Sequence, residues 1–105
     1  MFDVSLEDIK LVREKYVTSM QPFKISNFPP KEKRKYILLC MIVHLFDEGK
    51  KYSEKEINEI LKPVYQDYVM IRRYLVEYQF LNRLSDGSEY WLVANKNNYL
   101  IYIED

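Results

Sequence analysis

The sequence predicts a mainly helical α+β domain organised around one buried helix. Three observations predict this class. Residues 36–46 are apolar or aromatic except for one histidine, so a helix there has no polar face and must be covered by other parts of the chain or by a partner. Helix-start signals recur at Ser5, Ser53 and Asp67. An Asp-Gly pair at 86–87 lies between two β-prone runs, which is typical of a hairpin.

Composition narrows the class of protein further. The chain has 105 residues, the size of one domain, and its 48% hydrophobic and 30% charged residues are ordinary for a soluble protein. Sixteen basic and sixteen acidic residues cancel, which argues weakly against a dedicated nucleic-acid binder. The single cysteine excludes an internal disulfide and suits a reducing cytoplasm.

Membrane association and secretion are not expected. The apolar run 36–46 is too short to span a bilayer, which needs about 20 apolar residues. The first residues, Met-Phe-Asp-Val-Ser, lack the basic and apolar regions of a secretion signal. We therefore predict a cytoplasmic protein with no membrane partner.

Residues 1–26 are predicted to form a helix and a connector that pack on the core. Ser5 and Asp8 have the spacing of a capping box. The apolar residues that follow recur on one side of an amphipathic helix of about 14 residues: Leu6, Ile9, Val12, Tyr16 and Met20. Pro22 is expected to end this helix, and residues 23–30 to form an extended connector.

The buried helix is expected to start at Pro30 or Lys31 and to end at residues 47–49, with Gly49 as its C-terminal cap. Four basic residues lie in its first turn: Lys31, Lys33, Arg34 and Lys35. Their charge has the unfavourable sign for that end of a helix. They are either a solvated helix end, the favoured interpretation, or a contact for a phosphate or an acidic partner.

Two shorter helices are predicted after a brief strand at residues 50–52. A capping box begins the first at Ser53, and Pro63 ends it. Asp67 caps the second, which covers residues 67–78. At about 100° per residue, its buried side holds Ile71, Tyr74, Leu75 and Tyr78, while its outward side holds Val69, Arg72, Arg73, Val76 and Glu77.

The last third of the chain is predicted to be a hairpin and an apolar segment. Residues 81–84 and 89–93 form the two strands, and residues 99–103 form either another strand or a tail packed on the body. The order of helix, strand, helix, tight turn, helix and hairpin is that of a winged helix-turn-helix. We therefore assign residues 27–105 to such a domain, with an added N-terminal helix.

The chain also resembles a known family. The resemblance covers about residues 28–91, and its motifs include Phe28-Pro29, Tyr52-Ser53-Glu54-Lys55-Glu56, Asp67-Tyr68, Ile71-Arg72-Arg73-Tyr74-Leu75-Val76 and Asp86-Gly87. The family is the uncharacterised bacterial domain of unknown function 2087, found alone or fused to ArsR-type transcriptional regulators. Membership implies a winged-helix-like fold and a regulatory context but no reaction. Gln79 departs from the family pattern, which has glycine there, so the end of helix 67–78 is expected to differ.

The first functional hypothesis is a transcriptional regulator that binds double-stranded DNA through helix 67–78 and the wing at 81–93. One of Arg72 and Arg73 would reach a guanine edge and the other a phosphate, while Val69 would touch a thymine methyl. Residues 66–83 carry a net charge of only +1, and one arginine could instead pair with Glu77 or another acid. The residues assigned to the DNA contact are Gln66, Tyr68, Val69, Arg72, Arg73, Arg83, Lys50 and Lys51.

The alternative hypothesis is a winged-helix scaffold that contacts proteins, including a second copy in a homodimer. Val69 and Val76 on the exposed side of helix 67–78, or the segment 99–103, would form the interface.

Catalytic and metal-binding functions find little support. Cys40 and His44 have a metal-ligand spacing on one helix, but the chain holds no second cysteine or histidine. The apolar run around Cys40 disfavours a thiolate nucleophile. The chain has no phosphate-binding glycine loop and no recognisable carboxylate pair. We therefore expect no metal, no cofactor and no enzymatic activity.

Overall fold

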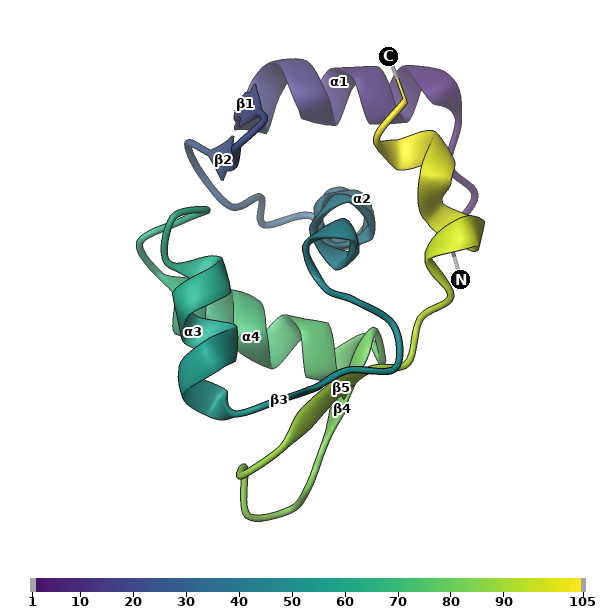
Figure 1. Cartoon of the computed structure of the whole chain (residues 1–105). Helices are drawn as coiled ribbons and strands as arrows, with labels where there is room; N and C mark the ends of the chain where they lie inside the picture. Colours follow the sequence, from purple (N-terminus) through teal and green to yellow (C-terminus); the bar gives the residue numbers. More distant parts are fainter. Residues whose placement is uncertain (1, 105) are drawn as a thin grey trace.

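The computed structural model of the chain describes residues 2–104 and shows a mixed α+β domain (Figure 1). In the labels used here, α marks α-helices, β strands and η 3₁₀ helices. The elements, in order, are α1 (Leu6–Tyr16), β1 (Val17–Met20), β2 (Phe23–Ile25), α2 (Glu32–Ile42), η1 (Val43–Leu45), β3 (Lys51–Tyr52), α3 (Glu54–Leu61), α4 (Tyr68–Glu77), β4 (Leu81–Arg83), β5 (Tyr90–Leu92) and η2 (Lys96–Tyr102).

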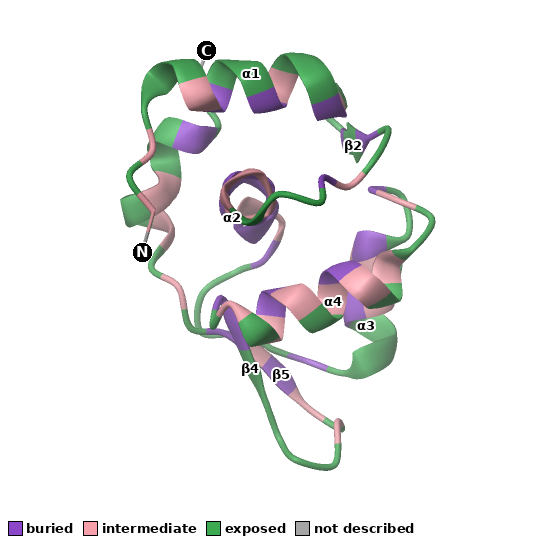
Figure 2. Ribbon diagram, turned by 180° about the vertical axis from the view of Figure 1, so that it is seen from behind, coloured by how far each residue is buried: buried purple, intermediate pink, exposed green. Residues whose placement is uncertain are grey.

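Helix α2 is the buried centre of the domain, as its sequence predicts. Every residue from Ile37 to Val43 is at most 1% exposed, and Phe46 is fully buried. Figures 1 and 2 show α2 end-on, with α1 and η2 on one side and α3 and α4 on the other. The predicted cap is wrong, however. The helix finishes in η1, whose C-cap is the extended Phe46, and Gly49 lies in the following turn with φ +75°.

The N-terminal helix is shorter than predicted. Its capping box between Ser5 and Asp8 is present, but α1 ends at Tyr16 and the chain turns into an antiparallel hairpin, β1–β2. The Gln21–Pro22 bond, which is cis, lies in the turn between the strands. The β-branched residues at the start of β1 favour a strand, and pairing with β2 supplies the hydrogen bonds that a longer helix would have made. The predicted connector at residues 23–30 is therefore a strand over its first three residues.

Helices α3 and α4 begin where the sequence places them. The side chain of Ser53 accepts a hydrogen bond from the backbone of Glu56, whose carboxylate accepts one from the backbone N–H of Ser53 in return. The carboxylate of Asp67 accepts a hydrogen bond from the backbone N–H of Met70. These contacts satisfy N–H groups that lack partners within a helix.

A three-stranded antiparallel sheet with the order β3-β5-β4 completes the C-terminal half. Strand β5 is central, with Tyr90 opposite both Tyr52 and Arg83, and Trp91 opposite both Lys51 and Asn82. The loop between β4 and β5 contains Gly87 with φ +76°, a conformation that favours glycine. The predicted strand pair and turn are therefore confirmed.

Helix α4 was expected to end differently because Gln79 stands where the family pattern has glycine. This expectation is wrong. Gln79 adopts φ +66°, the left-handed conformation that glycine favours. The backbone N–H of Phe80 donates to the carbonyl of Leu75 at 2.9 Å, and that of Gln79 donates to Val76 at 3.0 Å. This pair of hydrogen bonds is the Schellman motif, and the buried side chains of Phe80 and Leu75 supply its usual hydrophobic residues.

The C-terminal segment forms η2, so the strand alternative for residues 99–103 is wrong and the packed-tail alternative is confirmed. Tyr102 is buried, and its carbonyl accepts a hydrogen bond from Arg13 of α1 at 2.9 Å. The carbonyl of Tyr99 lies 2.8 Å from the imidazole Nε2 of His44. These contacts attach η2 to α1 and η1.

The basic first turn of α2 mostly contacts other parts of the same chain. Lys33 forms an ion pair with Asp8 of α1 at 2.8 Å, and Lys35 pairs with Glu32 at 3.4 Å. Arg34 donates a hydrogen bond to the hydroxyl of Tyr16. These contacts favour a structural role for the turn over a phosphate contact.

Within residues 2–104, no helix combines the length and the apolar composition that crossing a membrane requires.

Candidate functional site

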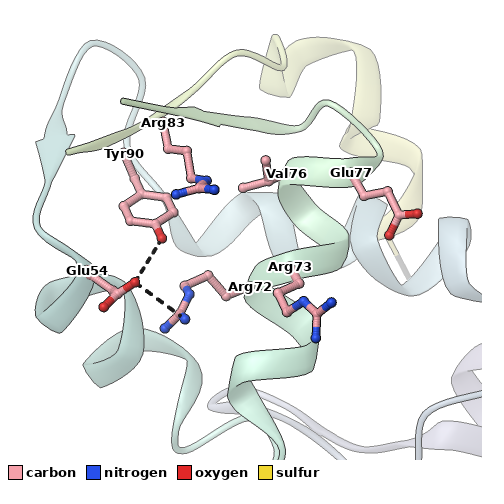
Figure 3. A pocket seen from close by; sticks show the side chains of 7 residues that line it. All are labelled: Glu54, Arg72, Arg73, Val76, Glu77, Arg83 and Tyr90. Atoms are coloured by element: carbon pink, nitrogen blue, oxygen red, sulfur yellow. Dashed lines mark hydrogen bonds and ion pairs between the residues drawn. The ribbon is translucent and has the colours of Figure 1, made fainter. Parts of the chain in front are cut away.

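A cleft of about 420 Å³ lies between α4, the first turn of α3 and the β4–β5 hairpin (Figure 3). It brings together three arginines from α4 and β4, the two elements that the Schellman turn connects. Its lining residues are Glu54, Arg72, Arg73, Val76, Glu77, Arg83 and Tyr90. Three arginines against two glutamates leave the lining with one excess positive charge.

The three arginines have different surroundings. Arg72 and Arg73 are neighbours on α4, so they leave the helix about 100° apart. Arg72 turns toward α3 and is only 15% exposed along its side chain, whereas Arg73 is exposed. Arg83 is the last residue of β4 and reaches the cleft from the hairpin.

Arg72 is held by two residues of α3. One terminal nitrogen, Nη2, lies 3.4 Å from Oε1 of Glu54, and the other, Nη1, donates a short hydrogen bond to Oδ1 of Asn58. The prediction that Arg72 points outward is therefore wrong, since α3 supplies partners that the helical period alone does not reveal. The alternative that one arginine pairs with an acid is confirmed, and the acid is Glu54.

Tyr90 joins the same network from β5. Its hydroxyl donates to Oε1 of Glu54 at 3.1 Å, so one carboxylate oxygen bridges the sheet and α4 (Figure 3). Burial raises the pKa of Tyr90 above its ordinary value, and the neighbouring carboxylate of Glu54 raises it further. The hydroxyl therefore stays protonated and remains a donor at neutral pH.

Arg73 and Arg83 have no such partner. Among residues 2–104, neither guanidinium forms an ion pair or a side-chain hydrogen bond. A planar guanidinium with unused donors can bind a phosphate or a carboxylate in a bidentate manner. Two guanidinium groups at the cleft therefore have donors that no other side chain of residues 2–104 uses.

The other residues predicted to contact DNA lie outside the cleft. Lys51 pairs with Glu89 at 3.4 Å, and Lys50 lies over the ring of Tyr52. Val69 is 40% exposed on the first half of α4, as predicted. Gln66 is exposed beside a different hollow, near the β1–β2 hairpin, and Tyr68 is half-buried with Lys62 over its ring.

Val76 does not have the exposure predicted for it. It is half-buried and packs against the core, because the β4–β5 hairpin lies over the second half of α4. Val76 therefore contributes less exposed surface than the sequence predicts, and it lines the cleft.

Cys40 and His44 do not come together as a metal site. Cys40 is fully buried, and that burial raises the pKa of its thiol to about 12. The imidazole of His44 instead contacts a backbone carbonyl. Nowhere in the described part of the chain do three histidine, cysteine, aspartate or glutamate side chains gather in a way that could hold a metal ion.

Glu54, Asn58 and Tyr90 are the residues of the site that sequence reasoning missed. In the sequence, Glu54 is only a member of a capping box, and Tyr90 is only an aromatic strand residue. Glu54 and Asn58 contact Arg72, and Tyr90 contacts Glu54 across 36 residues of the chain. No local sequence pattern predicts these contacts. The tight turn between α3 and α4 was the one available signal that these helices face each other.

Together, the fold and the site define a small α+β domain with an arginine-lined cleft. The chain belongs to the family described as "Uncharacterized protein conserved in bacteria (DUF2087)", which matches residues 24–92. The match therefore covers the part of the chain from β2 to β5, including every residue that lines the cleft. Comparisons with curated proteins and with solved structures gave no match.

Proposed function

We propose that residues 27–105 form a winged helix, with α4 as its recognition helix and β4–β5 as its wing. The element order α2-β3-α3-α4-β4-β5 supports this proposal, as does the antiparallel sheet in which β3 pairs with β5. The short turn between α3 and α4 is the kind that joins the two helices of a helix-turn-helix. Helix α1 and the β1–β2 hairpin are additions that help to cover the central helix.

We propose further that this domain binds double-stranded DNA, as a regulatory module without a reaction of its own. The observation that carries this proposal is the pair Arg73 and Arg83, two guanidinium groups from α4 and the wing that line one cleft and have no acidic partner in residues 2–104. In a winged helix those positions face the major groove and the adjacent sugar–phosphate backbone. Arg73 is the candidate for a base edge and Arg83 for a phosphate.

The remaining predicted contacts have smaller roles in this proposal. Val69 lies one helical turn before Arg73 on the exposed side of α4, where it can touch a thymine methyl. Lys50 and Lys51 lie beside the wing, but the pairing of Lys51 with Glu89 reduces its attraction for phosphate. Arg72 acts as a positioning residue, because its contacts with Glu54 and Asn58 fix α4 against α3.

The test is binding of a labelled duplex pool of randomised sequence to the parent chain, Arg73→Ala and Arg83→Ala over a series of salt concentrations. Arg83→Ala should bind more weakly and with a salt slope smaller by about 0.9, the value for one lost phosphate contact. Arg73→Ala should bind its preferred sequences more weakly by about 1–3 kcal/mol, the value for one lost base-edge contact. Lys10→Ala is the matched control, since it removes one exposed positive charge from α1, away from the cleft. Unchanged binding in both cleft variants, or no salt-dependent binding by the parent, would refute the proposal.

A second candidate function, contact with another protein, has its own supporting observation. Val69, Leu84 and Val93 are 40%, 43% and 55% exposed around α4 and the hairpin. A second copy of the chain is the simplest partner. Val69→Asp should then shift the molar mass measured by light scattering toward the monomer, whereas Val69→Ala should shift it less. A parent chain that is monomeric at all concentrations tested would exclude the homodimer.

A further inference from the structure

We propose that Glu54 is a built-in competitor for Arg72, occupying a guanidinium that a DNA phosphate would otherwise bind. This inference rests on the proposed DNA-binding function and adds a side chain that lowers the affinity of the domain for DNA. Glu54 and the phosphate group are both oxyanions, and each needs the same side of the Arg72 guanidinium. The bound carboxylate therefore lowers the affinity of the cleft for DNA.

The location of Glu54 supports this role. It is the first residue of α3, and its side chain lies inside the cleft among groups from three other elements (Figure 3). A Cβ placed on Gly87 of the wing loop would lie 3.8 Å from Oε1 of Glu54 and 3.5 Å from Nη1 of Arg83. The carboxylate thus lies between Arg72 and the part of the wing that carries Arg83.

Tyr90 keeps the carboxylate in this position. The side chain of Glu54 is 49% exposed and has a path to solvent, but the hydroxyl of Tyr90 donates to the same oxygen that faces Arg72. The negative charge is therefore held at the centre of the cleft. An approaching phosphate experiences repulsion from it as well as competition for the arginine.

Arg72 can exchange one anion for another without losing its position. Its Nη1 is bound to Asn58, so the guanidinium remains aimed into the cleft when Glu54 leaves. An ion pair with a half-exposed partner contributes little to stability, so a phosphate replaces the carboxylate at small cost. Guanidinium–phosphate contacts are frequently bidentate, which favours the exchange once DNA is bound.

The experiment compares binding of the randomised duplex pool by the parent, Glu54→Gln and Glu59→Gln. Glu54→Gln keeps the length of the side chain and an oxygen for Tyr90 and Arg72 but removes the charge. We expect about five- to tenfold tighter binding at 0.1 M salt and a salt slope larger by about 0.9, the contribution of one added phosphate contact. Glu59→Gln removes the same charge from the exposed face of the same helix and should have a much smaller effect.

Two further variants test whether Glu54 lowers the affinity for DNA through its contact with Arg72. The gain of Glu54→Gln should be much smaller in an Arg72→Ala background than in the parent, because only the repulsion between the carboxylate and the phosphate then remains to be relieved. Glu54→Ala, which removes the carboxylate altogether, should also bind more tightly than the parent. Circular dichroism melts establish that each variant is folded under the binding conditions.

The outcomes separate this inference from the proposed function. A parent chain that binds the duplex while Glu54→Gln binds equally or more weakly overturns the competitor role and leaves DNA binding intact. A gain of the same size in the Arg72→Ala background also overturns it. A parent chain that does not bind the duplex at low salt overturns the proposed function and, with it, this inference.

Discussion

Replacing Gln79 with glycine should stabilise the domain. Gln79 is the only non-glycine residue of the described chain, residues 2–104, with a positive φ. Its side chain is exposed and forms no hydrogen bond within that part of the structure, so the substitution removes almost nothing from the folded state. Its backbone N–H continues to donate to Val76 in the variant, because glycine retains that group.

The expected gain in the free energy of unfolding is the difference between two backbone effects, one in the folded state and one in the unfolded state. A side chain in the left-handed region costs about 1–2 kcal/mol relative to glycine because of the crowding around its Cβ. Glycine also has more conformational freedom than glutamine in the unfolded state, which lowers the free energy of unfolding by about 0.5–1 kcal/mol. The net gain is about 0.5–1 kcal/mol, which raises the Tm of a domain of this size by about 2–8 °C.

The assay is urea unfolding followed by circular dichroism, with thermal melts as a second measurement. Gln66→Gly is the matched control, because Gln66 is also exposed but lacks a positive φ. That variant should lose about 0.5–1 kcal/mol, so the same chemical change has opposite signs at the two positions. A loss of stability at position 79 equal to that at position 66 would refute the claim that a left-handed Gln79 ends α4.

Three other predictions concern single side chains. Arg72→Ala should lower the free energy of unfolding by about 0.5–1.5 kcal/mol, because α4 loses the hydrogen bond to Asn58 and a weak ion pair with the half-exposed Glu54, and denaturant titration measures this. Asp8→Asn should lower Tm at neutral pH, because the ammonium of Lys33 holds the pKa of Asp8 at about 2 in the folded protein. A depressed pKa contributes its full stability above the ordinary value of 3.8 and loses it as the pH falls toward about 2, so the difference from the parent should vanish between about pH 4 and pH 2. Burial raises the pKa of Cys40 to about 12, so iodoacetamide should label this thiol only after denaturation, as intact-mass spectrometry would show.

The parts of the fold that sequence predicted are those with local causes. A capping box within Ser53–Glu56 and an Asp-Gly turn at 86–87 need only neighbouring residues, and both are present in the structure. The buried helix was equally predictable, since a run that is apolar except for one histidine has no polar face to turn toward solvent.

The errors arise where the sequence pattern allows two backbone conformations and hydrogen bonding or packing decides between them. Residues 17–20 continue the apolar spacing of α1, but they pair with residues 23–25 and become a strand instead. Position 79 was expected to change the helix end because it lacks glycine. The Schellman hydrogen bonds and the packing of Phe80 nevertheless hold Gln79 in the left-handed conformation.

The helical period also explains why only part of the candidate site was predicted correctly. Ile71 and Leu75 define the buried side of α4. At 100° per residue Arg73 lies opposite that side, whereas Arg72 lies at its flank, where a neighbouring helix can reach it. Helix α3 does so with Glu54 and Asn58, so two adjacent arginines have different environments.

The two valines of α4 extend the same reasoning along the helix axis. Val69 and Val76 are seven residues apart and therefore project at nearly the same angle. Val69 is 40% exposed, but Val76 is half-buried because the β4–β5 hairpin lies over that half of the helix. A partner can therefore contact α4 at Val69 on its first half and at Arg73, which is exposed. Arg83 lines the cleft from the hairpin, so a duplex that contacts both arginines has to lie against α4 and the wing together.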